Sequence, residues 1–327
     1  MRALLFRAAL ERISGRLATL APDLEIVVLE PDGRLTLNGE TLTGEADPEV
    51  LWLSRDALGP QLTDFMGHLS AAKRARWVQT AIAGLDHPVW TPLADPRLQV
   101  SNPSAQAPAI AEYVTIHALS LLHPIAETAR HQADHAWKRV DFREVAETRW
   151  LIIGFGNIGQ EIARRARAFG AAIEVARRSD TPHELADQIS SQADLPQRLP
   201  HADVVVLACP LTEATRDMAD AAFFAAMKPG SILINIGRGG LVDEDALKLA
   251  LDQDRPAHAV LDVFRTEPLP TDSWIWDHPK VRMTPHSSNR GSLTGDRGDQ
   301  LFLDNLARLL KGETPHNLVP PGDIGAG

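Results

Sequence analysis

The segment "LIIGFGNIGQEIARRA" (residues 151–166) decides the fold of the central part of the chain. An apolar run, predicted to be a buried strand, leads into Gly154, Gly156 and Gly159, and a helical pattern follows. A GxGxxG motif between a strand and a helix is typical of a dinucleotide-binding turn. The first glycine permits the tight turn, the second lets the pyrophosphate approach the backbone, and the third lets helix and strand pack closely. Asn157 and Ile158 open the helix, whose free N–H groups face the phosphates.

The next predicted strand ends in "EVARRS" (174–179), which indicates the kind of dinucleotide. A site for NAD carries Asp or Glu at this point, on the ribose 2′-hydroxyl. Arg177 and Arg178 stand there instead, followed by Ser179. Guanidinium groups attract a 2′-phosphate and can bind it through two hydrogen bonds. We therefore expect NADP(H) to be preferred, with NAD still possible.

Strands and helices alternate along most of the chain. From "WLIIGFG" to "VRMTPH" (150–286) the order is the βαβ pattern of a parallel, doubly wound sheet. A long helix that precedes it (109–137) is expected to kink near Pro124. Residues 1–100 predict a smaller α/β unit with buried strands in 24–30, 49–54 and 76–84. We expect a Rossmann-type dinucleotide-binding domain over 101–289, and a flavodoxin-like substrate domain over 1–100 to which the tail, 290–327, returns.

Length, charge and cysteine content limit the function further. A chain of 327 residues is longer than a single hydrophobic core usually supports, which predicts two domains. The net charge of −10 argues against a nucleic-acid or anionic-membrane partner. No apolar run is long enough to span a bilayer. The single cysteine, Cys209, excludes an internal disulfide and fits the cytoplasm. His131 and His135 have the spacing of a zinc helix, but Gln132 replaces the glutamate that a zinc protease needs, so we expect no metal.

Three residues of complementary chemistry each follow a predicted strand: Arg238, Glu267 and His286. The carboxyl ends of parallel strands meet at one edge of a sheet, so we expect the three to converge. Reduction of a 2-oxo acid needs an arginine that holds the carboxylate and polarises the ketone, and an acid that protonates its oxygen. A carboxylate beside the histidine would favour its protonated form and fix its tautomer. Taken singly, each residue could equally be a loop ion pair, a surface carboxylate or a structural histidine.

The order of several segments resembles the D-isomer-specific 2-hydroxyacid dehydrogenase family. The matching segments are "WVQTAIAGLD", "AIAEYV", "GFGNIGQEIARRARAFG", "VVVLACPLTEATR", "MKPGSILINIGRGGLVDEDAL", "DVFRTEPLP" and "TPHSS". The resemblance implies two similar α/β domains and Arg238, Glu267 and His286 as the catalytic set. It implies substrate-carboxylate binding by the backbone near Ala83 and Gly84. The cofactor contacts that it implies are Cys209, Pro210, Thr215, Ile236, Asp262 and Ser288, with Asp262 at the nicotinamide carboxamide. Arg177 departs from the acidic ribose ligand that is usual in the family.

The function expected from this resemblance is reduction of a small 2-oxo acid, such as glyoxylate or hydroxypyruvate, by NADPH to a D-2-hydroxy acid. One alternative is a bulkier or phosphorylated 2-oxo acid, for which Arg55 would be the additional cation. Another is a dinucleotide-sensing binding protein, since some members of the family act as corepressors. The apolar helix that begins at residue 109 lies at a subunit interface in the family, so the resemblance also implies a homodimer.

Overall fold

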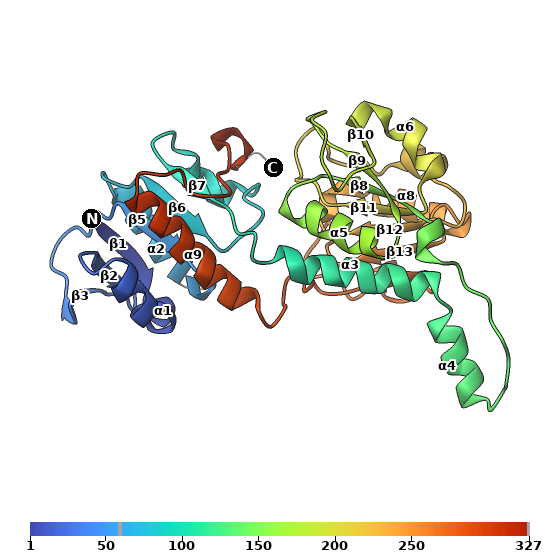
Figure 1. Cartoon of the computed structure of the whole chain (residues 1–327), viewed down its shortest axis with the longest axis horizontal. Helices are drawn as coiled ribbons and strands as arrows, with labels where there is room; N and C mark the ends of the chain where they lie inside the picture. The colour runs from blue at the N-terminus through green and yellow to red at the C-terminus, as the bar shows by residue number, and fades with distance from the viewer. Residues whose placement is uncertain (58–60, 326–327) are drawn as a thin grey trace. The chain divides into compact units, whose positions relative to one another are not determined.

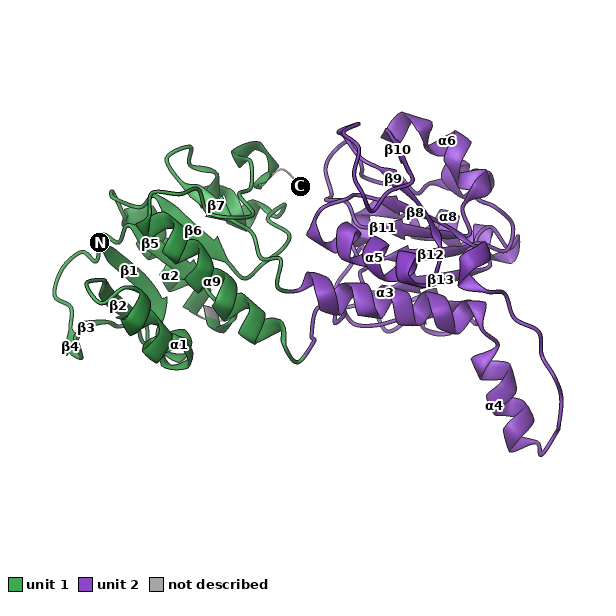
Figure 2. Ribbon diagram, in the orientation of Figure 1, with its two compact units in different colours: residues 1–105, 292–327 green, residues 106–291 purple. Residues whose placement is uncertain are grey.

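The computed structural model describes residues 1–57 and 61–325, which form two compact units. Unit 1 combines residues 1–105 with 292–327, and unit 2 comprises residues 106–291 (Figures 1 and 2). The boundary expected at residues 100 and 101 falls inside a strand of unit 1, β7 (Gln99–Ser101). The segment 101–108 is therefore partly structured, since it begins in β7 and ends in the first helix of unit 2.

Unit 2 is built on a seven-stranded sheet in which all neighbouring strands are parallel, in the order β10-β9-β8-β11-β12-β13-β14. The strands are β8 (Arg149–Ile153), β9 (Ala172–Ala176), β10 (Gln188–Ser190), β11 (Val204–Leu207), β12 (Ile232–Asn235), β13 (His258–Leu261) and β14 (Val281–Met283). The helices are α3 (Ala107–Leu122), α4 (Ile125–Ala133), α5 (Asn157–Ala168), α6 (Leu195–Arg198), α7 (Ala221–Ala226) and α8 (Glu244–Asp252).

Helices cover both faces of this sheet because successive strand residues point to opposite sides. Ile152 packs with residues of α3 and α5, whereas Leu151 packs with residues of α7 and α8. Figure 1 shows α3 and α5 side by side on their face. The predicted doubly wound fold is confirmed, and the apolar runs of its strands reflect burial on both faces.

An acidic side chain at the start of β11 joins three segments of unit 2. Asp203 is buried, and its carboxylate accepts hydrogen bonds from Arg143 at 2.8 Å, from Lys228 at 2.6 Å and from the amide of Arg149 at 2.8 Å. Burial by itself opposes ionisation, but the hydrogen bonds from Arg143 and Lys228 lower the pKa of Asp203 below its ordinary value.

The long helix predicted over 109–137 is two helices. Pro124 has no N–H and cannot continue the hydrogen-bond pattern, so α3 ends at Leu122 and α4 leaves at an angle of 59°. Figure 1 shows α4 projecting from the rest of unit 2. Within the described residues, no one helix combines the length and apolarity that crossing a membrane requires, whereas α3 and α4 taken together pass that test as a bent pair.

Unit 1 also has a seven-stranded sheet, in the order β4-β3-β2-β1-β5-β6-β7. β3 (Leu35–Leu37) and β4 (Glu40–Thr41) form a hairpin, which pairs antiparallel with β2 (Glu25–Leu29). The other strands, β1 (Arg2–Phe6), β5 (Val50–Leu53), β6 (Trp77–Thr80) and β7, continue the sheet in parallel. The helices are α1 (Arg7–Leu20), α2 (Gln61–Ala71) and α9 (Thr294–Leu310).

The tail returns to unit 1 through α9, as expected. The ring of Phe302 is fully buried and stacks on Trp52 and Trp77, with centroid distances of 4.2 Å and 5.7 Å. Asn305, also buried, donates to the side chain of Gln79 at 2.8 Å. Helix α9 thus supplies part of the core of unit 1, together with a polar contact that fixes its position.

Candidate active site

The glycine motif forms the turn between β8 and α5. Gly154 has φ = +99°, and a Cβ on it would lie 2.6 Å from the backbone of Ala208. A Cβ on Gly159 would lie 2.3 Å from the carbonyl oxygen of Gly154, whereas the space beside Gly156 is open. The first turn of α5 has no side-chain cap and no acidic residue. Its N–H groups and its positive dipole end therefore fit the pyrophosphate of a dinucleotide.

Arg177 follows β9 directly and is held by local contacts. Its guanidinium lies 5.7 Å from the ring centroid of Phe155. It donates through Nε to the carbonyl of Ser179 at 2.9 Å, and through Nη2 to the carbonyl of Thr181. A guanidinium has five N–H donors, so these contacts orient the group without using all of them. Arg178 is exposed beside it. This pair of cations fits a 2′-phosphate better than a free ribose hydroxyl.

The other residues implied to contact the cofactor lie after β11, β12, β13 and β14. Thr215 braces the first of these loops, since its hydroxyl donates to the carbonyl of Pro210 at 2.8 Å and accepts from the amide of Thr212 at 2.8 Å. Cys209 lies in the same loop, and burial raises the pKa of its thiol to about 11. Ile236 is buried where β12 ends. The structure gives these side chains bracing and packing contacts, and their cofactor contacts stay predictions.

Arg238 stands in a turn that is fixed from two sides. The side-chain amide of Asn235 donates to the carbonyl of Arg238 at 2.9 Å and accepts from the amide of Gly237 at 3.1 Å. A Cβ on Gly239 would lie 1.8 Å from the carbonyl carbon of Phe264, so only glycine allows this approach to the loop after β13. The Arg238 side chain therefore projects from a rigid backbone, which lies at the carboxyl edge of the sheet.

Glu267 and His286 form a hydrogen-bonded pair. Oε2 of Glu267 lies 2.7 Å from Nδ1 of His286, and Oε1 accepts from the amide of Phe264 at 3.0 Å. An ionised carboxylate only accepts, so Nδ1 carries a proton and the tautomer is defined. Nε2 is then the ring atom that can exchange a proton with a bound molecule. The structure thus brings together two of the three residues predicted to converge.

Asp262 holds the turn that carries His286. It is almost fully buried, and Oδ1 accepts from the amide of Ser287 at 2.8 Å and from the hydroxyl of Thr284 at 2.6 Å. Ser288, also buried, donates its amide to both carboxylate oxygens. His286 has φ = +48°, a strained conformation for a residue with a side chain that costs on the order of 1–3 kcal/mol. The hydrogen bonds to Asp262 offset this cost.

The residues that support Asp262 are not evident from the sequence. The hydroxyl of Tyr113, on α3, lies 2.8 Å from that of Thr284. The only signal was indirect: an acidic residue directly after a buried strand needs donors, and Thr284 follows the neighbouring strand. The partner on α3 is 171 positions away in the sequence. Asp262 was implied to contact the nicotinamide, and in the structure it braces the histidine turn.

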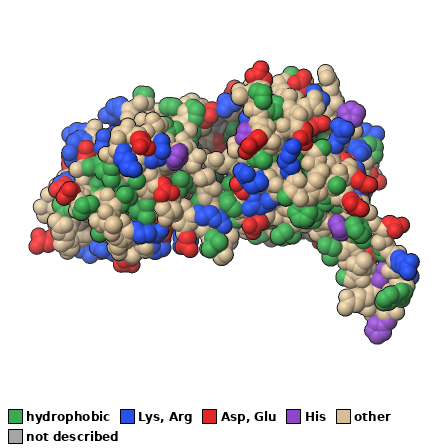
Figure 3. All heavy atoms as spheres, in the orientation of Figure 1, with side chains coloured by type: hydrophobic (Ala, Val, Ile, Leu, Met, Phe, Trp, Pro, Cys, Tyr) green, Lys and Arg blue, Asp and Glu red, His purple; other side chains and the backbone are tan. Residues whose placement is uncertain are grey.

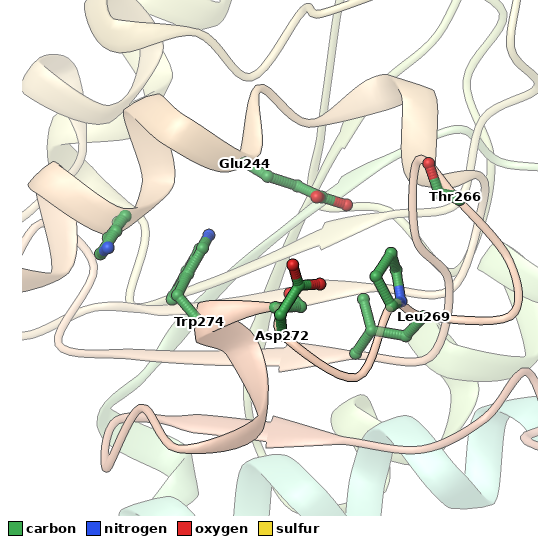
Figure 4. A pocket seen from close by; sticks show the side chains of 8 residues that line it. Glu244, Thr266, Leu269, Asp272 and Trp274 are labelled. Atoms are coloured by element: carbon green, nitrogen blue, oxygen red, sulfur yellow. The ribbon is translucent and has the colours of Figure 1, made fainter.

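A hollow of unit 2 lies beside the loop that carries Glu267, since Thr266 and Leu269 of that loop line it. Its volume is about 390 Å³, and its lining includes Glu244, Thr266, Leu269, Asp272 and Trp274 (Figure 4). Glu244 accepts from the amide of Arg265 at 2.9 Å, and burial raises the pKa of its carboxyl group. None of the predicted site residues lines this hollow. Among the described residues, no cluster of three or more His, Cys, Asp or Glu could hold a metal.

In unit 1, the predicted substrate residues follow parallel strands at their carboxyl ends. Ala83 and Gly84 lie in the loop after β6. Arg55 begins a short 3₁₀ helix (Arg55–Ala57) after β5. Its guanidinium lies against Gly295 of α9, where a Cβ would be 2.1 Å from Nη1. The structure thus places all three where ligands bind in open α/β sheets.

The glycine turn between β8 and α5 is that of a dinucleotide-binding domain. The sequence model of the NAD-binding domain of the D-isomer specific 2-hydroxyacid dehydrogenases matches residues 115–288, more than half of the chain. The chain therefore belongs to that family. A glyoxylate/hydroxypyruvate reductase B from Pectobacterium carotovorum is 40% identical over 52% of the chain and 53% of its own length. A chloroplastic D-3-phosphoglycerate dehydrogenase from Arabidopsis thaliana is 37% identical over 66% of the chain and 35% of its own length. The chain thus spans about a third to a half of the length of these relatives.

Solved structures match over nearly the whole chain. A D-isomer specific 2-hydroxyacid dehydrogenase from Xanthobacter autotrophicus, in complex with NADPH and MES, has a TM-score of 0.78 at 26% identity over 98% of both chains. An NADPH-dependent glyoxylate/hydroxypyruvate reductase from Sinorhizobium meliloti, in complex with NADP and sulfate, has a TM-score of 0.76 at 26% identity, again over 98% of both chains.

Proposed function

We propose that the protein reduces a small 2-oxo acid, of the size of glyoxylate or hydroxypyruvate, to the D-2-hydroxy acid with NADPH. The observation that carries this proposal is the 2.7 Å pair of Glu267 and His286 on a braced turn. An imidazole that is oriented by a carboxylate and can deliver a proton from Nε2 suits reduction of a carbonyl. Membership of the family supports the same chemistry.

Each residue has one role in this reaction. Arg238 binds the substrate and polarises its ketone oxygen, since a fixed cation stabilises the charge that develops there. His286 gives a proton to that oxygen. Glu267 keeps the imidazole oriented and stabilises its protonated form. The backbone amides of Ala83 and Gly84 bind the substrate carboxylate. We assign unit 1 as the substrate domain and unit 2 as the dinucleotide-binding domain.

The cofactor, when bound, supplies the hydride. The turn at Gly154, Gly156 and Gly159 fits its pyrophosphate, as the open space and the uncapped helix indicate. Arg177 and Arg178 favour NADPH over NADH. The two solved relatives described above, which bind NADPH or NADP, support this preference.

A phosphorylated 2-oxo acid is the second candidate substrate, because one of the relatives is a D-3-phosphoglycerate dehydrogenase. Arg55 would then bind the phosphate. A steady-state assay of NADPH and NADH oxidation with glyoxylate, hydroxypyruvate, phosphohydroxypyruvate and a branched 2-oxo acid separates these substrates. We expect the highest kcat/KM with NADPH and a small unphosphorylated acid. Cofactor binding without turnover of any of these acids would indicate a dinucleotide sensor instead.

We also propose that the protein is a homodimer in the cytoplasm. On α3, α4 and the chain that follows, large apolar side chains are exposed, and Figure 3 shows apolar atoms on the surface of this projecting segment. They are Ile116, Ile125, Trp137 and Phe142, and the Trp137 side chain is 98% exposed. Apolar groups gathered on one segment favour a protein partner, and a second copy is the partner that the resemblance to the family implies for the helix that begins at residue 109. The single free cysteine fits a reducing compartment.

A further inference from the structure

Two side chains of unit 1 donate hydrogen bonds to successive carbonyl groups in the loop after β6. The hydroxyl of Thr80, the last residue of β6, donates to the carbonyl oxygen of Ile82 at 3.0 Å. The side-chain amide of Asn102 donates to the carbonyl oxygen of Ala83 at 2.6 Å. Asn102 directly follows β7, the strand beside β6 in the sheet (Figure 1). The donors therefore come from two neighbouring strands at the same edge.

These bonds set the direction of two N–H groups. A trans peptide is planar, and its C=O and N–H point in opposite directions. The carbonyl of Ile82 shares a peptide with the N–H of Ala83, and the carbonyl of Ala83 shares one with the N–H of Gly84. Fixing the two carbonyls on Thr80 and Asn102 therefore points each N–H away from the side chain that holds the carbonyl of its own peptide. Neither N–H donates to any residue in the described ranges 1–57 and 61–325.

Asn102 is itself held in one orientation. Its backbone amide donates to the carbonyl of Asn317 at 2.9 Å, which ties it to the returning tail. Its side-chain Oδ1 is buried and finds no hydrogen-bond partner among the residues that the structure describes. In the opposite rotamer of the amide, Oδ1 would face the carbonyl oxygen of Ala83, and two acceptors would repel each other. The observed rotamer therefore keeps the hydrogen bond from Nδ2 to that carbonyl, although Oδ1 is left without a donor.

We propose that Thr80 and Asn102 are positioning residues that aim the amides of Ala83 and Gly84 at the carboxylate of the substrate. This inference rests on the proposed function. Two adjacent N–H donors match the two oxygens of a carboxylate, and their hydrogen bonds to an anion are stronger than bonds to a neutral carbonyl. Thr80 and Asn102 thereby select 2-oxo acids over carbonyl compounds that lack a carboxylate, although neither side chain needs to touch the substrate.

The test compares Asn102→Ala and Thr80→Val with the parent protein. We expect the KM for glyoxylate and the inhibition constant of oxalate, a planar dicarboxylate, to rise together by roughly three- to tenfold, the loss expected for one or two misdirected hydrogen bonds. The Kd of NADPH should not change. The kcat/KM for methylglyoxal, which has the reactive carbonyl but no carboxylate, should change little.

Three further variants distinguish orientation of the amides of Ala83 and Gly84 from general stabilisation of the loop. Thr80→Ser keeps the hydroxyl and should retain the parent's oxalate constant. Asn102→Asp sets a second acceptor against the carbonyl of Ala83 and should weaken oxalate more than Asn102→Ala does. Thr19→Val is the matched control, because the Thr19 hydroxyl also donates to a carbonyl, that of Gly15 at 3.0 Å, on the exposed face of α1. Thermal unfolding of each variant shows that the fold is kept.

The outcomes distinguish this inference from the proposed function. A parent protein that reduces no 2-oxo acid refutes the proposed function. A parent that reduces glyoxylate, with an unchanged oxalate constant in Asn102→Ala, refutes the aiming role alone. Equal losses for methylglyoxal and glyoxylate also refute it, because they would indicate general damage. If the Asn102→Ala or Thr80→Val protein does not fold, the two remaining variants decide. The inference then requires that Asn102→Asp binds oxalate more weakly than the parent and that Thr80→Ser binds it as tightly as the parent.

Discussion

Replacing Glu267 by Gln tests the carboxylate–histidine pair most directly. The substitution keeps an oxygen that can accept from the amide of Phe264, and it removes the negative charge beside Nδ1 of His286. The neutral amide then no longer stabilises the positive charge of the imidazolium and no longer requires a proton on Nδ1. Because reduction needs an imidazole that delivers a proton from Nε2, kcat for glyoxylate should fall.

The size of the loss follows from the geometry. Charge centres about 4 Å apart interact by about 1 kcal/mol in water and by about 4 kcal/mol at an effective dielectric constant of 20. A tenfold change in rate corresponds to about 1.4 kcal/mol, so kcat should fall by between roughly fivefold and a thousandfold. The His286 and Glu267 side chains are 46% and 36% exposed, which places the expected loss near the lower end, at roughly tenfold.

The assay is the initial rate of glyoxylate reduction with both substrates saturating. Glu244→Gln is the matched control, because the Glu244 carboxylate also accepts a hydrogen bond from a backbone amide of the loop after β13, that of Arg265, but projects into the separate hollow of Figure 4. In Glu244→Gln, kcat should equal that of the parent. An unchanged kcat in Glu267→Gln would show that the carboxylate does not support His286, and the assignment of the pair would be wrong.

Four further predictions concern the cofactor, assembly, stability and reactivity. Arg177→Asp should lower the ratio of kcat/KM for NADPH to that for NADH by at least about tenfold, and equal efficiency with both cofactors in the parent would contradict the assignment. Light scattering should give twice the 35.7 kDa of one chain, and a single-chain mass at micromolar concentration would refute the dimer. Because the folded state lowers the pKa of Asp203, the stabilisation is present above the unfolded value of about 4 and is lost as the pH falls through the folded value. Asp203→Asn should therefore flatten the acid decline in the free energy of unfolding, and exposed Asp252→Asn should not; parallel declines would argue against the assignment. With a pKa of about 11, Cys209 should react with iodoacetamide at pH 8 roughly two orders of magnitude more slowly than in the unfolded chain, and rapid labelling of the native protein would contradict its burial.

Local patterns in the sequence predicted most of unit 2. The apolar strands and the glycine turn carry strong signals, because burial on both faces and the close approach at Gly154 and Gly159 each demand particular residues. Weak signals were missed. β10 has only three residues at a sheet edge, and α2 contains Gly67 and buries only Phe65 and Leu69. Short elements with few buried residues leave little periodicity to detect.

The candidate site also combines features that local patterns predict with features that they do not. The positions of Arg238, Glu267 and His286 follow from the predicted strand ends, because a parallel sheet brings its carboxyl ends to one edge. The supporting contacts could not be predicted, since they join residues distant in sequence: Tyr113 with Thr284, and Asn102 with Ala83. Such pairs depend on the packing of whole helices and strands, which periodicity does not encode.

The composition of unit 1 has a consequence for synthesis of the protein. Phe302 and Asn305 complete its core and its buried polar contacts, yet the ribosome adds Asn305 226 residues after its partner Gln79 on β6. At typical elongation rates, residues 1–105 remain without α9 for roughly 10–40 s after their own synthesis. During that interval the apolar surface around Trp52 and Trp77 has no permanent cover, while unit 2, which is continuous in sequence, can fold. We infer that nascent chains depend on chaperones chiefly through their earliest segment.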